Sequence, residues 1–134
     1  MTREPIVGDI MRRSPVTTTP HHFLADAQEL MSREGTHQLP VVENGTLVGM
    51  LSDRDLHAHS GYLDRTRVDA AMSYGVIAVS PADTAQHAAR VLIERRINAV
   101  PVVEQERLIG IVTKTDLLRL LVSVLERLRT GAAA

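Results

Sequence analysis

The feature that most constrains this chain is an internal repeat that covers nearly all of its 134 residues. Residues 7–56 align with residues 68–117 without a gap, so every position has its counterpart 61 residues further on. A gap-free register of this length makes chance similarity a poor explanation, and two copies are too few for a solenoid. A duplicated subdomain is the better interpretation. The identical pairs are Val7/Val68, Met11/Met72, Pro20/Pro81, Ala27/Ala88, Pro40/Pro101, Val41/Val102, Val42/Val103, Glu43/Glu104, Leu47/Leu108, Gly49/Gly110, Asp55/Asp116 and Leu56/Leu117.

Each copy predicts the same first elements. A short extended piece (16–18 and 77–79) is stopped by a proline, and an amphipathic helix follows. Asp83, with Gln86 three residues later, indicates a capping box at the start of the second helix. Gly35 fits a C-terminal cap in the first copy, where Arg96 stands in the second. The apolar helix faces are Leu24, Ala27, Leu30 and Met31 in the first copy, and Ala85, Ala88, Val91 and Leu92 in the second.

A hairpin and a short helix complete each copy. The runs 38–43 and 46–51 flank Asn44-Gly45, a strong two-residue turn signal. The second copy repeats the hairpin around Gln105-Glu106, with weaker turn chemistry. Ser52 and Thr113 are expected to begin the helices that follow, and Gly49 and Gly110 are expected to serve packing. The predicted domains are 1–59 and 68–130, with 60–67 as the linker.

One copy alone has a single main helix and about three short strands, which cannot cover both faces of its sheet. Two copies packed together solve this problem. The predicted fold class is therefore α+β, with two βαββα units packed sheet to sheet and related by a pseudo-two-fold axis.

The hairpins and their flanks resemble the CBS domain, named for cystathionine β-synthase. The pattern is a hydrophobic-Pro-Val-Val-Glu hairpin strand followed by Gly, two apolar residues, Ser or Thr, two further residues, and Asp-Leu. It is met at residues 39–43 and 49–56, and again at 100–104 and 110–117. The preceding Asp9-Ile10-Met11 and Ala70-Ala71-Met72 match the family's usual lead-in segment. The resemblance extends from Val7 to about Leu120.

This resemblance implies a CBS-domain pair whose clefts between the copies bind AMP, ADP, ATP or S-adenosylmethionine. Asp55 and Asp116 would accept hydrogen bonds from ribose hydroxyls, and Ser52 and Thr113 would form hydrogen bonds with phosphate. Residues before the hairpin prolines would line the adenine pockets. The implied nucleotide-binding residues are Thr17, His37, Gln38, Pro40, Ser52, Arg54 and Asp55 in the first copy, and Ala78, Asn98, Ala99, Pro101, Thr113, Lys114, Thr115 and Asp116 in the second.

The chemistry of these residues is reasonable without the resemblance. A carboxylate can accept hydrogen bonds from two hydroxyls at once, and a helix N-terminus offers free N–H groups to an anion. Arg54 and Lys114 add positive charge there. The same Ser/Thr-x-x-Asp spacing is also a plain capping box, and one pair of residues can both cap and bind. Ala99 is small where Gln38 is bulky, so the second cleft is expected to bind better.

Composition excludes several other classes of function. The net charge is −1 and aromatic residues make up 2%, which argues against nucleic acid and an anionic membrane as partners. The chain contains no cysteine, and we expect neither a signal peptide nor a membrane helix, so the expected location is the cytoplasm. His21-His22 and His57-x-His59 lack the spacing of a metal site. No catalytic motif is present, so no enzyme activity and no required cofactor are expected.

The last predicted helix, 115–129, carries an apolar stripe larger than a small core needs. It is expected either to pack within the chain or to form a subunit interface, and the family's flat dimers favour a homodimer. The predicted function is regulatory energy sensing, in which nucleotide binding changes the conformation and signals to an unidentified effector protein. The alternative is a structural dimerisation adaptor with degenerate, unoccupied clefts.

Overall fold

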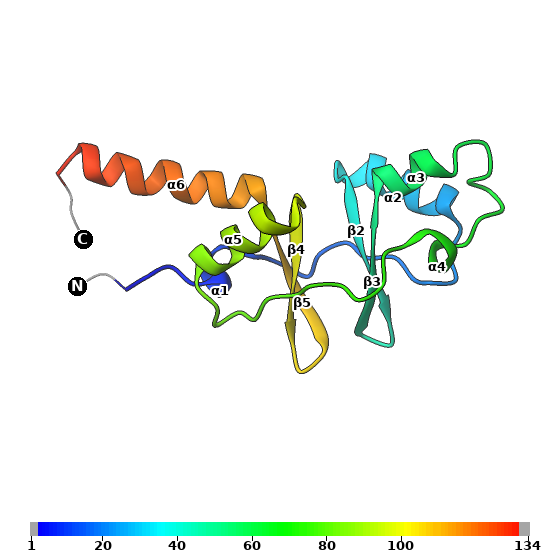
Figure 1. Ribbon diagram of the computed structural model, residues 1–134, viewed down its shortest axis with the longest axis horizontal. Coiled ribbons are helices and arrows are strands. Elements are labelled where there is room, and N and C mark those ends of the chain that lie inside the picture. The colour runs from blue at the N-terminus through cyan, green and yellow to red at the C-terminus, as the bar shows by residue number, and fades with distance from the viewer. Residues whose placement is uncertain (1–2, 132–134) are drawn as a thin grey trace. The chain divides into compact units, whose positions relative to one another are not determined.

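The computed structural model describes residues 3–131, which form two compact units of helices and antiparallel strands (Figure 1). The first-copy unit contains residues 14–77 and 105–108. The second-copy unit contains residues 3–13, 78–104 and 109–131. The expected mixture of helix and antiparallel sheet is confirmed.

In the first-copy unit, helix α2 is followed by a hairpin and two short helices. Strands β2 and β3 are antiparallel, with a register shift at Val41/Val42. Asn44 and Gly45, which join them, both have positive φ angles, as a tight hairpin turn of this kind requires. The elements are α2 (Leu24–Glu34), β2 (Gln38–Glu43), β3 (Thr46–Ser52), α3 (Asp53–Ala58) and α4 (Val68–Ala71).

In the second-copy unit, β5 pairs with both β4 and the short strand β1. Gln105 and Glu106, which are counted with the first-copy unit, connect β4 to β5, again with positive φ at both residues. Helix α6 continues well beyond the strands of its own unit (Figure 1). The elements are α1 (Val7–Ile10), β1 (Arg12–Arg13), α5 (Ala85–Arg95), β4 (Ala99–Glu104), β5 (Arg107–Thr113) and α6 (Lys114–Arg129).

The two sequence copies exchange their lead-in segments. Val7 lies in the core of the second-copy unit, and its N–H donates to the carbonyl of Asp83 at 2.8 Å. Val68 lies in the core of the first-copy unit, and its N–H donates to the carbonyl of His22, also at 2.8 Å. Each compact unit thus joins the lead-in of one copy to the helix and hairpin of the other. The boundaries predicted at 60–67 describe the sequence copies and stay a prediction.

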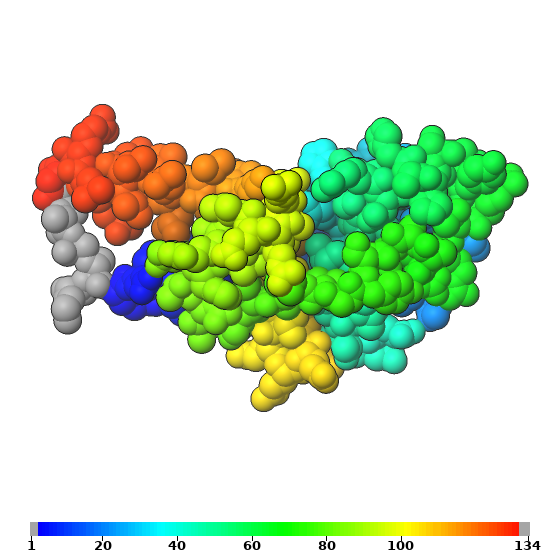
Figure 2. Space-filling model, in the orientation of Figure 1, coloured from blue at the N-terminus to red at the C-terminus, as the bar shows by residue number. Residues whose placement is uncertain are grey.

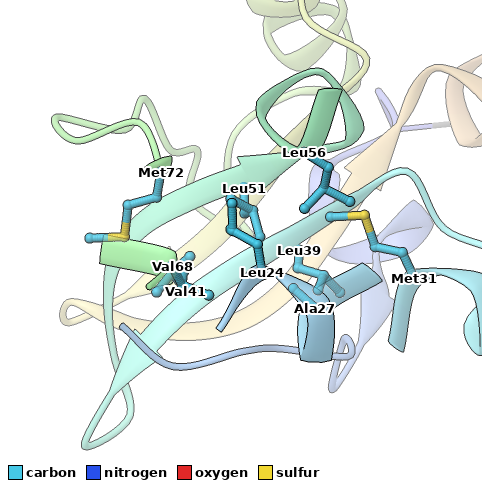
Figure 3. Packing of buried hydrophobic residues seen from close by; sticks show 9 residues of the cluster. All are labelled: Leu24, Ala27, Met31, Leu39, Val41, Leu51, Leu56, Val68 and Met72. Carbon is cyan, nitrogen blue, oxygen red and sulfur yellow. The ribbon is translucent and has the colours of Figure 1, made fainter. Parts of the chain in front are cut away.

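Each unit has its own apolar core. In the first-copy unit, one face of α2 packs on the hairpin, and Val68 of α4 and Met72, which caps α4, complete the core (Figure 3). Glycines keep the lead-in segments close to the strands: a Cβ at Gly49 would lie 2.6 Å from Met72 Sδ, and one at Gly110 would lie 2.8 Å from Met11 Sδ. Their predicted packing role is confirmed. The cores are Leu24, Ala27, Met31, Leu39, Val41, Leu51, Leu56, Val68 and Met72, and Val7, Val79, Ala88, Leu92, Val100, Val102 and Val112.

Most predicted elements are confirmed, and two details differ. The extended pieces 16–18 and 77–79 form isolated bridges, from Thr18 to Val41 and from Val79 to Val102, instead of full strands. The helices, hairpins and the Gly35 cap lie where they were predicted.

The capping box predicted at Asp83 is wrong. Thr84 is the N-cap of α5, and its hydroxyl accepts the N–H of His87 at 3.0 Å. The Asp83 carboxylate instead accepts the N–H of Ser80 at 2.8 Å. The preceding turn therefore uses this acidic side chain, and the helix begins one residue later.

Candidate functional site

Asp116, in the first turn of α6, is the most enclosed of the predicted site residues that carry a charge. Its Oδ2 accepts the N–H of Thr113 at 2.9 Å, and Thr113 Oγ1 accepts the N–H of Asp116 at 3.2 Å. This reciprocal pair is a capping box, whose N-cap contributes about 1 kcal/mol. The second carboxylate oxygen, Oδ1, accepts a bond from Arg12 Nε at 3.3 Å. Asp116 is buried, whereas the Arg12 side chain is 57% exposed.

Asp55 has the corresponding place at α3, but its surroundings differ. Its Oδ2 accepts the N–H of Ser52 at 2.8 Å and the Ser52 hydroxyl at 3.1 Å. Its Oδ1 has no hydrogen-bond partner among residues 3–131, and the side chain is half-buried. Ser73 occupies the repeat position equivalent to Arg12. One oxygen of Asp55 therefore remains available to accept a hydroxyl.

The residues before the hairpins are tied to the following helices by backbone bonds. The carbonyl of His37 accepts the N–H of Asp53, and the carbonyl of Asn98 accepts the N–H of Lys114, both at 3.0 Å. The first N–H of each helix is therefore already used, and the third bonds the N-cap hydroxyl. Within the described part of the chain, the second N–H, of Arg54 or Thr115, is left for an anion.

The remaining predicted residues lie in the hairpin strands or next to them, within their own units. The carbonyls of Pro40 and Pro101 accept the N–H groups of Thr18 and Val79 at 3.0 Å, which brings the preceding Thr17 and Ala78 next to the hairpins. Ala99, Pro40 and Pro101 are buried, and Gln38 is half-buried. The exposed members of the two sets are Thr17, His37 and Arg54, and Ala78, Asn98, Lys114 and Thr115.

Sequence reasoning missed Arg12 as a member of the second set. Arg12-Arg13 is too short to be a nucleic-acid patch, and nothing in its local pattern indicates a bond to a residue 104 positions later. One signal was available: the repeat alignment places Arg12 opposite Ser73, so the symmetry of the copies breaks there.

The charged residues at the two helix starts have net charges of opposite sign. Asp53, Arg54 and Asp55 combine two carboxylates with one guanidinium at α3. Lys114, Asp116 and Arg12 combine one carboxylate with two cationic groups at α6. A bound anion is therefore favoured at α6, and a cationic group at α3.

Several histidine side chains make local contacts within the first-copy unit. His21 lies between Glu43 (Nε2 to Oε2, 2.9 Å) and Arg67 (Nη2 to Nδ1, 2.8 Å). The bond between Arg67 and Asp69 raises the pKa of the Arg67 guanidinium above its usual value. His59 Nδ1 lies 3.0 Å from the carbonyl oxygen of Asp55. Between residues 3 and 131, no group of three or more potential metal ligands gathers, and none of the helices there has the length and apolar character to cross a membrane.

Comparison with known proteins places these features in one family. The model of the CBS domain matches residues 7–60 and 68–123. CBS domain-containing protein YhcV of Bacillus subtilis is 32% identical over 114 residues, which cover 83% of this chain and 81% of that protein.

Two solved structures with bound ligands have the same fold. CBSX2, an Arabidopsis thaliana protein crystallised in complex with AMP, superposes with a TM-score of 0.83 at 30% identity, over 90% of this chain and 98% of that one. The CBS domain pair of protein MJ0100, crystallised with 5′-methylthioadenosine and S-adenosyl-L-methionine, superposes with a TM-score of 0.83 at 26% identity, with the same coverage. Two family matches at the repeat spacing, and these superpositions, show that the chain belongs to the CBS-domain family and carries a tandem pair of CBS domains.

Proposed function

We propose that this protein is a regulatory module that binds adenosine-containing ligands at the two sites centred on Asp55 and Asp116. Ligand binding would shift a conformational equilibrium, and an effector protein would respond to it. The module would act as a homodimer in the cytoplasm, without a required cofactor and without catalysis. The observation that carries the proposal is the capped aspartate, which the repeat preserves in both copies.

Ribose recognition follows from the way in which each aspartate is held. The capping box uses Oδ2 and fixes the rotamer of the carboxylate. At Asp55 the second oxygen is available, and each carboxylate oxygen has two lone pairs. A prepositioned carboxylate loses little side-chain entropy on binding a sugar hydroxyl. The relatives crystallised with AMP and with S-adenosylmethionine show that this fold accommodates the adenosyl group.

The two sites would select different adenosyl ligands. Arg12 and Lys114 favour a phosphate beside Asp116, so AMP, ADP or ATP is the expected ligand class there. Arg12 bonds Asp116 through Nε, and its two terminal nitrogens have no other partner among residues 3–131, so they can donate to phosphate. The more acidic set at Asp55 favours S-adenosylmethionine, whose sulfonium is cationic. Greater burial and charge thus support the second site as the nucleotide site.

Calorimetric titration with AMP, ATP and S-adenosylmethionine tests this assignment. Asp→Asn keeps an oxygen for the cap and removes the charge, so Asp116→Asn should weaken AMP binding by about tenfold or more while the fold persists. Asp55→Asn is the matched control, because it makes the same change at the equivalent position and should leave AMP binding unchanged. Arg12→Ala should weaken AMP binding more than S-adenosylmethionine binding.

A different result would favour the second candidate function, the structural adaptor with empty clefts. If no ligand produces heat or a thermal shift, the adaptor replaces the sensor. If AMP binds and both Asp→Asn variants retain its affinity, these aspartates are caps only and the proposed sites are wrong.

A further inference from the structure

The residue that follows the lead-in methionine has the same backbone position in both copies but a different side chain. Arg12 pairs with Ile111 of β5. Ser73 forms a bridge with Met50 of β3, which is the repeat counterpart of Ile111. An arginine in one copy and a serine in the other are therefore alternatives at one equivalent place beside the hairpin, and the two sites can be compared directly.

This difference decides how accessible each site aspartate is. Both aspartates hold the N–H of their N-cap residue through Oδ2. At Asp116, Arg12 Nε also donates to Oδ1 at 3.3 Å, and only 7% of the aspartate side chain is exposed. Asp55 is half-buried, and its Oδ1 has no hydrogen-bond partner within the described range 3–131. A ribose hydroxyl can therefore reach Oδ1 of Asp55 directly, whereas at Asp116 it has to displace Arg12.

The Arg12 side chain can leave without any movement of the backbone. It is 57% exposed, and the bond to Asp116 is its only side-chain hydrogen bond within residues 3–131. The lead-in segment itself is held in place, because α1 contacts α6 and Met11 packs against the core of the second-copy unit. Figure 2 shows this segment in blue below α6, which is orange to red. A rotation of one side chain is thus sufficient to open the aspartate.

The free-energy cost of opening depends on the ligand. Displacing Arg12 replaces a charge-assisted hydrogen bond of an enclosed carboxylate by a weaker bond from a neutral hydroxyl. A ligand with a phosphate gives the guanidinium a new anionic partner, which an arginine can bind through two nitrogens at once. A ligand without a phosphate gives it none. The cost is therefore recovered only when a phosphate is present.

We propose that Arg12 makes the Asp116 site selective for phosphorylated adenosine compounds: it holds Oδ1 until a nucleotide binds, then bonds the phosphate, and so excludes adenosine and S-adenosylmethionine. This inference rests on the proposed function and names the residue that determines its specificity. The Asp55 site, where Ser73 replaces the arginine, accepts ligands that lack a phosphate.

Calorimetric titration of the full chain with adenosine and with AMP tests this role. Adenosine should fill a single site in the wild-type protein and a second site in Arg12→Ala, because the variant leaves Asp116 open. AMP should bind Arg12→Ala more weakly by about fivefold, since the phosphate loses its guanidinium. Arg13→Ala is the matched control: it removes the same charge from the next residue of β1, which is exposed, and should change neither result.

The reverse substitution tests the same role in the first copy. Ser73 is exposed, so Ser73→Arg can be accommodated without repacking of the core. The new guanidinium should bond Asp55 and weaken adenosine binding at that site by about fivefold, while the melting temperature stays close to that of the wild-type protein.

The outcomes separate this inference from the proposed function. If AMP binds but Arg12→Ala gains no adenosine site, or if adenosine fills both sites of the wild-type protein, Arg12 does not control access and the inference is overturned while the sensor stands. Unchanged adenosine binding in Ser73→Arg would count against it in the same way. If neither ligand binds the wild-type protein or the Arg12→Ala variant, the proposed function fails and the inference fails with it.

Discussion

The two sequence copies adopt one backbone pattern with different side chains, and the first copy uses the less strained ones. Its hairpin turns at Asn44-Gly45 and its helix α2 ends at Gly35, whereas the second-copy hairpin turns at Gln105-Glu106 and α5 ends at Arg96. All these positions have positive φ, where a residue other than glycine or asparagine is unfavourable by about 1–2 kcal/mol. The fold thus tolerates local strain when packing determines the path of the chain.

The core side chains also differ between the copies, and the larger ones belong to the first copy. Leu24, Leu39 and Leu51 of the first-copy unit correspond to Ala85, Val100 and Val112 in the second. The second copy therefore has smaller core side chains at these positions and more residues with an unfavourable backbone conformation. Its extra structure is α6, and its site aspartate is the one bonded by an arginine. We interpret the first copy as the one that contributes more to stability.

The largest expected effect concerns the exchanged lead-in segments. A fragment of residues 14–77 keeps Val68 and Met72 with the core that they complete, and should show helical circular dichroism and cooperative melting. A fragment of residues 1–64 has the same length but lacks both side chains, and should be largely unfolded. Equal melting of the two fragments would mean that the exchange contributes little to stability.

Core truncation compares the two units directly. Leu39→Ala should lower the free energy of unfolding by about 3 kcal/mol and Val100→Ala by about 2 kcal/mol, since fewer methylene groups are lost from the valine. Urea denaturation measures both. Ile93→Ala, which is exposed on α5, serves as the control and should change stability by less than about 0.5 kcal/mol. A larger loss for Val100→Ala would reverse the comparison.

Turn exchange is expected to have a smaller effect. Gln105→Asn combined with Glu106→Gly should raise stability by about 1–2 kcal/mol, because both positions have positive φ. The reciprocal Asn44→Gln/Gly45→Glu should lower it by a similar amount. Thermal unfolding of both variants checks this pair, and a destabilised Asn-Gly variant would show that contacts of the Gln105 or Glu106 side chains outweigh the backbone strain.

The smallest expected effect is at the helix ends. Arg96→Gly relieves a left-handed residue (φ 55°) and should stabilise the protein by about 0.5–1 kcal/mol, after the greater flexibility of glycine in the unfolded chain is counted. Gly35→Arg should destabilise it by about 1 kcal/mol. If both substitutions change the stability in the same direction, backbone strain at the C-cap does not distinguish the two copies.

Much of each unit could be predicted from the sequence because the signals are local. Apolar periodicity gave the buried faces of α2 and α5, Asn44-Gly45 gave the first hairpin, and the Ser/Thr-x-x-Asp spacing gave the capping boxes at α3 and α6. The start of α5 was placed one residue early, because Asp83 is as good a cap by type as Thr84, and only the preceding turn determines which of them is used.

The sequence by itself determined the repeat, the family and the residue types at each candidate site. Only the tertiary structure decided which lead-in segment packs with which hairpin, because Val7 and Val68 are identical, as are Met11 and Met72, and either core accepts them. That exchange brings Arg12 from the start of the chain to Asp116. A contact between residues so far apart depends on the path of the backbone between them, and no local pattern of side chains encodes it.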